Sequence, residues 1–105
     1  MSVAQVFEKF EQNFNSEAAE GMDLVFQFNI EDDQNHHVIV KDGTCKVVQG
    51  DHEDPSVTLI MDAATLKGIA SGETDGMQAF MSGQLRAEGD MMLATKLGQL
   101  FSMGS

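Results

Sequence analysis

The 105-residue chain has no tryptophan, no tyrosine, one proline, one cysteine and three histidines. The single cysteine, Cys45, cannot form an internal disulfide, so we expect a cytoplasmic protein. No apolar run approaches the roughly 20 residues of a membrane span, and no basic segment followed by an apolar stretch predicts a secretory signal. At this length we expect a single domain over residues 1–105.

Basic residues are also scarce. Six Lys and Arg stand against 17 Asp and Glu, which gives a formal net charge of -11. Such a surface repels the phosphates of nucleic acids and the headgroups of anionic lipids. We therefore expect no nucleic-acid partner and at most transient membrane contact, although solubility alone explains most of these acids.

Residues that commonly carry catalysis or bind metals are few. His36 and His37 are adjacent at the start of an expected strand, so their side chains should point to opposite faces and cannot easily share a metal ion. His52 lies among Asp51, Glu53 and Asp54 in an expected loop. These residues could bind a metal ion, but a solvated loop is the simpler explanation of the cluster. No phosphate-binding glycine loop, nucleophile elbow or zinc-ligand spacing occurs. We expect no catalytic residue, no metal and no cofactor.

Hydrophobic periodicity predicts a helix followed by strands. Apolar residues at helical spacing indicate a helix over residues 2–15, with Ser2 and Gln5 as a capping box. Alternating apolar and polar residues predict a strand over residues 22–31 with one buried side. Asp42-Gly43 is a two-residue hairpin signal. The remaining expected strands cover residues 37–41, 44–49, 56–61 and 84–88.

Helical spacing returns after the fourth strand. Asp62 is the expected N-cap of one helix, and Thr74 or Asp75 caps a shorter helix that ends at Gly83. A last helix is expected over residues 90–101. This order of elements predicts an α+β fold in which helices pack on one face of an antiparallel five-stranded sheet. The first four strands are expected to form a meander.

The segment from Phe80 to Asp90, Phe-Met-Ser-Gly-Gln-Leu-Arg-Ala-Glu-Gly-Asp, resembles the signature of sterol-carrier-protein (type two) domains. The order of the upstream elements is similar to that family too, so the resemblance covers almost the whole chain. It implies an apolar tunnel between sheet and helices for a sterol, fatty acid, phospholipid or acyl-CoA, without catalysis by the domain. The negative charge disfavours the acyl-CoA headgroup among these ligands.

Seven Phe and eight Met dominate the large apolar residues. Methionine adapts to irregular apolar shapes, and Phe has no polar group, which suits a ligand recognised by its shape. A packed helix-on-sheet core explains the same residues, and the resemblance favours the ligand. The expected lipid-binding residues are Phe26, Phe28, Met61, Leu66, Ile69, Met77, Phe80, Met81, Leu85, Met91, Met92, Leu93, Leu97, Leu100 and Phe101.

Two features of the C-terminal part leave alternatives open. Met91 and Met92 lie outside the apolar stripe of the last helix, where they either guard a pocket mouth or pack against the preceding helix. Arg86, the only arginine, pairs with an acid such as Glu88 or faces a ligand carboxylate or phosphate.

The expected function is non-catalytic binding or transfer of a lipid or other hydrophobic ligand. The alternative is an accessory protein that presents a hydrophobic substrate, such as a quinone precursor, to a partner enzyme. Related bacterial domains, as the resemblance implies, hold isoprenoid quinone precursors in this way. A homodimer through an exposed sheet edge also stays open.

Overall fold

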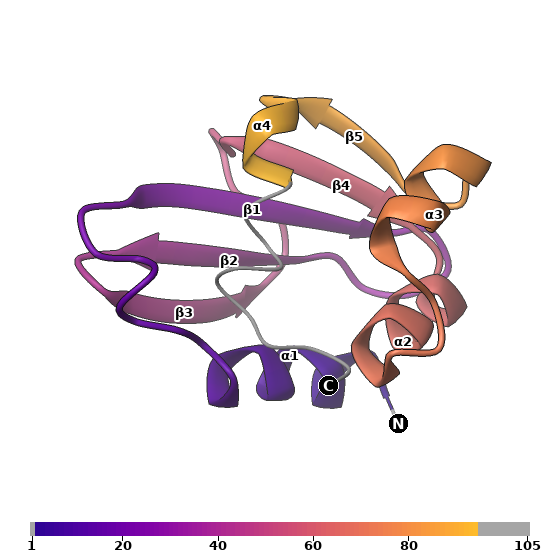
Figure 1. Ribbon diagram of the computed structural model, residues 1–105, viewed down its shortest axis with the longest axis horizontal. Coiled ribbons are helices and arrows are strands. Elements are labelled where there is room, and N and C mark those ends of the chain that lie inside the picture. The colour runs from indigo at the N-terminus through magenta and orange to yellow at the C-terminus, as the bar shows by residue number, and fades with distance from the viewer. Residues whose placement is uncertain (1, 95–105) are drawn as a thin grey trace.

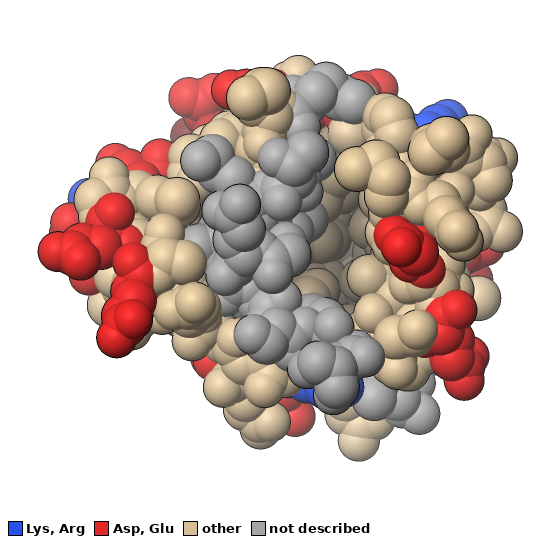
Figure 2. All heavy atoms as spheres, in the orientation of Figure 1, with Lys and Arg blue, Asp and Glu red and all other residues tan. Residues whose placement is uncertain are grey.

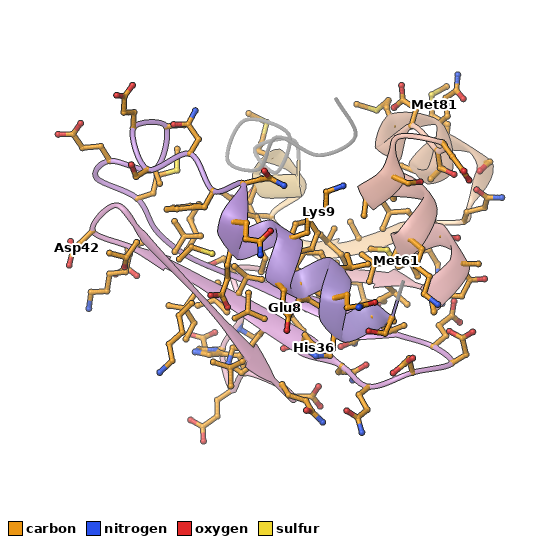
Figure 3. The ribbon with its side chains drawn as sticks, turned by 90° about the horizontal axis from the view of Figure 1, so that it is seen from below. Glu8, Lys9, His36, Asp42, Met61 and Met81 are labelled. Atoms are coloured by element: carbon orange, nitrogen blue, oxygen red, sulfur yellow. The ribbon has the colours of Figure 1, made fainter. Side chains whose placement is uncertain are left out.

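The computed structural model describes residues 2–94, which form one sheet with helices against it (Figure 1). Seen from below, α1, α2 and α3 lie on the same side of the sheet (Figure 3). The elements in chain order are α1 (Val3–Gln12), β1 (Asp23–Ile30), β2 (His36–Lys41), β3 (Thr44–Gln49), β4 (Val57–Met61), α2 (Ala63–Ser71), α3 (Gly76–Ser82), β5 (Arg86–Gly89) and α4 (Met91–Ala94).

The first helix begins as predicted and ends early. The Ser2 side chain accepts a hydrogen bond from the Gln5 N–H at 3.2 Å, and the Gln5 side chain accepts one from the Ser2 N–H at 2.7 Å, so the capping box is confirmed. The predicted end at residue 15 is wrong. The Asn15 side chain instead accepts a hydrogen bond from the Ala18 N–H, which starts a turn that competes with the helix.

The sheet is mixed, with strand order β3-β2-β1-β4-β5. β1, β2 and β3 form an antiparallel meander, but β4 runs parallel to β1 on its other side. The prediction of a purely antiparallel sheet and a four-strand meander is therefore wrong. The chain crosses the sheet after β3, and two hydrogen bonds hold the crossing, from the Val25 N–H to Ser56 Oγ at 3.0 Å and from the Ser56 N–H to the Val25 carbonyl at 2.9 Å.

The core lies between this sheet and the helices. β1 and β4 present their buried residues side by side, since Phe28 pairs with Leu59 and Ile30 with Met61 in the parallel register. From α1, Phe7 and Phe10 pack on Phe28 with ring centroids 5.2 and 5.6 Å away. Each such fully buried side chain contributes roughly 1.5–3 kcal/mol. The predicted alternation is confirmed for β4. In β1 the apolar Phe26, Phe28 and Ile30 are buried as predicted, but Gln27 between them is buried as well.

Local signals set the remaining boundaries. Asp42 and Gly43 both have positive φ, at 53° and 75°, as the hairpin turn requires. Asp62 caps α2, and Asp75, not Thr74, caps α3. Gly83, with φ 85°, ends α3 as predicted.

The fifth strand begins later than predicted. The Leu85 N–H donates to the Ala79 carbonyl at 3.0 Å and so still belongs to the end of α3. Pairing with β4 therefore starts at Arg86, opposite Ile60, and runs to Gly89. Of the last helix predicted over residues 90–101, the described part contains α4 only. Within residues 2–94, no helix is long and apolar enough to cross a membrane.

Candidate functional site

The predicted site residues fall into two groups of different exposure. The first group lies in the core between the helices and the sheet, and we call it the wall. Each of its residues is at most 2% exposed: Phe26, Phe28, Met61 and Leu66. Three more are half-buried and pack against that wall: Ile69, Leu85 and Leu93. Core packing explains the burial of these seven residues.

The second group is exposed and forms what we call the apolar rim: Met77, Phe80, Met81 and Met92. Their exposed fractions are 58%, 39%, 79% and 73%, and they are the exposed large apolar residues of the described chain. Met77, Phe80 and Met81 share one face of α3 because they are three and four positions apart. Met92 lies on α4, outside that face. Several exposed large apolar side chains on one helix face are typical of a binding surface.

The surface near α3 is hollowed. In Figure 1, α4 lies against β4 and β5, whereas α3 lies at the carboxyl ends of β1 and β4. Figure 2 shows the face hollowed on the inner side of α3. Figure 3 shows Met81 pointing outward from the molecule, whereas Met61 lies within it. The side chain of Met91 and residues Leu97, Leu100 and Phe101 lie outside the described part of the chain.

A small residue fixes α3 in this orientation. Ala79 is 1% exposed and turns inward, so the larger residues of the helix face out. The helix is held close to α2, because the Thr74 N–H donates to the Gly68 carbonyl at 3.0 Å and a Cβ at Gly68 would collide with the Thr74 side chain. The exposure of the rim therefore follows from tight packing on the opposite side of α3.

Two further hollows on the described surface have volumes of about 500 and 480 Å³. Polar side chains dominate their linings, so neither corresponds to the apolar tunnel that the family resemblance implies, and that tunnel stays a prediction. In the first, Lys9 joins two helices by donating from Nζ to the Ala70 carbonyl at 3.1 Å (Figure 3). The first hollow is lined by Gln5, Glu8, Lys9, Gln12 and Asn13. The second is lined by Ser16, Glu17, Glu20, Gly21, Asp42 and Gly43.

A polar network occupies the face of the sheet away from the helices. Gln27 of β1 is only 3% exposed. Its Nε2 donates to Asp51 Oδ1 and to Asn29 Oδ1, each at 3.0 Å, and its Oε1 accepts from the His52 N–H at 2.8 Å. The network fastens the acidic loop 50–55 to the sheet. Sequence reasoning missed Gln27, because a polar residue on the polar side of a strand is ordinarily solvated.

The histidines behave as structural residues. His36 faces the core and stacks on Phe7 with ring centroids 4.3 Å apart, whereas the His37 Nδ1 lies 3.0 Å from the Gly50 carbonyl on the other face. The prediction that the two point to opposite faces is confirmed. His37 and His52 have ring centroids 5.2 Å apart. Among residues 2–94, no cluster of three or more His, Cys, Asp or Glu could hold a metal ion.

Arg86 and Cys45 offer little chemistry. Arg86 Nη2 lies 3.3 Å from Glu31 Oε2, so the acid that it pairs with is Glu31 and not Glu88. The pairing crosses strands because β5 and β1 flank β4. Both side chains are more than half exposed, and such a pair contributes little. Burial, with a smaller contribution from Glu11, raises the pKa of the Cys45 thiol to about 11, which keeps it unreactive at neutral pH.

Residues 4–102 match the model of the SCP-2 sterol transfer family. Among curated proteins, hydroxysteroid dehydrogenase-like protein 2 of Xenopus tropicalis is 30% identical over 99 residues, which cover 91% of this chain and 24% of that protein. The chain thus spans about a quarter of the length of this curated relative.

Solved structures show the same fold. The palmitated form of SCP2L2 from Aedes aegypti is 26% identical, with a TM-score of 0.77 over 94% of this chain and 93% of that one. The sec-alkylsulfatase Pisa1 from Pseudomonas sp. is 21% identical, with a TM-score of 0.79 over 88% of this chain and 15% of that one. At the latter identity the likeness is one of fold.

Proposed function

The chain belongs to the SCP-2 sterol transfer family, and on that premise we propose that it binds and transfers a lipid or other hydrophobic ligand without catalysing a reaction on it. The observation that carries the proposal is the exposure of four large apolar side chains on α3 and α4, the apolar rim of Met77, Phe80, Met81 and Met92. The palmitated relative supports a ligand with a long acyl chain. Sterols and phospholipids are the other candidates.

The arrangement suits entry at the rim. Because the wall residues of the core are at most 2% exposed, a ligand gains contact first with the rim and then with the half-buried Ile69, Leu85 and Leu93. Burial of ten methylene groups would supply roughly 8 kcal/mol. Loss of translational freedom and ordering of the chain subtract from this figure. A ligand with a long apolar chain can therefore bind reversibly, as transfer requires.

Charge around the rim narrows the choice of headgroup. Glu73 and Asp75 precede α3, Glu88 and Asp90 precede α4, and all four are exposed. Arg86, which lies between these helices, is paired with Glu31. The proposed ligand therefore has a neutral or small headgroup, and acyl-CoA is disfavoured. For the same reason we propose that any membrane contact is transient and avoids anionic lipids.

The test combines native mass spectrometry with a designed pair of variants. We expect the protein as purified to carry a mass adduct that organic extraction releases. Met81→Glu places a charge in the rim and should weaken binding of a fluorescent palmitate analogue about tenfold, which is about 1.4 kcal/mol. Gln78→Glu adds the same charge to the exposed part of α3 outside the rim and is the matched control.

Equal affinity in both variants would remove the rim from the proposed site. A protein that carries no adduct and binds neither the palmitate analogue nor a fluorescent sterol would overturn the function. Turnover of a ligand, abolished by a single polar substitution, would contradict the non-catalytic part of the proposal.

A second candidate is an accessory protein that presents a hydrophobic substrate, such as a quinone precursor, to a partner enzyme. It is favoured by the relative that is named as dehydrogenase-like, in which the matching segment is about a quarter of the chain. Co-purification of one enzyme at constant stoichiometry, whose rate rises with the ligand-loaded protein and not with the empty one, would support this candidate. Full ligand transfer without any enzyme would favour the first.

A further inference from the structure

Three of the four rim residues are methionines, and solvent reaches all three. Met77, Met81 and Met92 are 58%, 79% and 73% exposed, whereas Met61 is 2% exposed in the core. Oxidation of a thioether depends on access to its sulfur. The structure therefore separates reactive methionines at the proposed ligand site from a protected one that supports the fold.

We propose that Met77, Met81 and Met92 form a peroxide-responsive modification site whose oxidation releases the apolar ligand. The proposal rests on the proposed function, because it concerns the regulation of that same site. Phe80, the remaining rim residue, has no comparable reaction and keeps part of the apolar surface in either state.

The reaction balances with hydrogen peroxide as the oxidant. The thioether sulfur attacks one peroxide oxygen, an S–O bond forms as the O–O bond breaks, and the second oxygen leaves as water after proton transfer. The sulfur loses two electrons and the peroxide gains them. A methionine sulfoxide reductase reverses the change, because two thiols become a disulfide while the sulfoxide oxygen leaves as water.

The effect on binding follows from desolvation. A sulfoxide is polar, and a ligand that covers it must remove its water without supplying a hydrogen bond. We expect oxidation of the rim to weaken ligand binding about tenfold, which is about 1.4 kcal/mol. In the free protein the sulfoxides stay hydrated, because the three side chains are exposed. The melting temperature should therefore change little, and this separates a switch from general oxidative damage.

The experiment exposes the purified protein to hydrogen peroxide for increasing times. Peptide mass spectrometry follows each methionine, with fragment ions separating Met92 from Met91, while binding of a fluorescent palmitate analogue and the melting temperature are measured in parallel. We expect the rim methionines to be oxidised before Met61, affinity to fall about tenfold, and methionine sulfoxide reductase with a thiol reductant to restore it.

Variants assign the effect. The triple variant Met77→Leu, Met81→Leu, Met92→Leu keeps apolar volume without the reactive sulfur. Its affinity measured after peroxide should equal its own affinity measured before peroxide. Met22→Leu removes a half-buried methionine outside the rim and should stay as sensitive as the wild type. Earlier oxidation of Met61, unchanged affinity of the oxidised wild type, or an equal loss in the triple variant would overturn the proposal. Untreated protein that binds no probe would instead overturn the proposed function.

Discussion

A substitution of Gln27 tests whether the face of the sheet away from the helices contributes to stability and not to ligand binding. Gln27→Leu keeps a side chain of similar size but removes the three hydrogen bonds that Gln27 makes to Asn29, Asp51 and His52. Each bond contributes roughly 0.5–1.5 kcal/mol. Asp51 is exposed and can recover water, which reduces the sum. We expect the free energy of unfolding to fall by about 2 kcal/mol.

Urea unfolding followed by circular dichroism measures this change directly. The same loss should lower the melting temperature by about 8–16 °C in a domain of this size. Gln49→Leu is the matched control, since Gln49 is exposed on the neighbouring part of the sheet and its side chain bonds only to the exposed Gln34 among the described residues. That control should change stability by less than about 0.5 kcal/mol.

Ligand affinity is the second readout of the same pair. Gln27 points away from the helices, and the apolar rim lies on the helix side, so the palmitate analogue should bind Gln27→Leu as tightly as the wild type at temperatures where both are folded. A loss of stability no larger than that of Gln49→Leu would refute the role of the network in holding the acidic loop. A parallel loss of affinity would refute the separation of the two faces.

Three further predictions concern the core, the first helix and the thiol. Phe7→Ala removes a ring that is 1% exposed and should cost about 3–5 kcal/mol in urea unfolding. Ser2→Ala deletes the capping box and should cost about 1 kcal/mol, so a loss as large as that of Phe7→Ala would contradict the assignment. Because burial raises the pKa of the Cys45 thiol from 9.0 to about 11, the unfolded chain releases this proton first, and stability should fall as pH rises between these values. Cys45→Ser should flatten that part of the pH profile, and an unchanged slope would assign it to other groups.

Local signals made much of the fold predictable. A capping box, an Asp-Gly turn and a glycine after a helix act within a few residues, so Ser2, Asp42 and Gly83 could be assigned from their neighbours in the chain. Alternation in β1 and β4 also identified which side chains face the core. What alternation does not contain is the identity of the neighbouring strand. The hydrogen bonds between Val25 and Ser56 hold the parallel pairing, and the residues next to either one in the chain do not predict them.

The candidate site was less predictable than the fold. The spacing of Met77, Phe80 and Met81 indicates an apolar helix face but not whether that face points inward. The structure decides this, because Ala79 is 1% exposed and turns inward, so the larger residues of α3 face outward. Gln27 was missed for a similar reason, since its burial depends on Asp51 and the loop that follows β3. Contacts between distant segments decide exposure, and a pattern along the chain does not record them.

The position of β5 at the edge of the sheet has a consequence for folding kinetics. β1, β2 and β3 are joined by short turns and can pair rapidly, whereas Val25 and Ser56 are 31 residues apart and must close a long loop first. Among the described strands β5 pairs with β4 alone, so we expect the α3–β5–α4 segment to join the meander last. Parts of a protein open as separate cooperative units at free energies below that of global unfolding, and we expect this segment to be one of them. The rim residues lie on that segment, so under the proposed function we expect amide exchange in α3 and β5 to be faster than in β1, β2 and β3, and a chain-like ligand to enter where the exchange is faster.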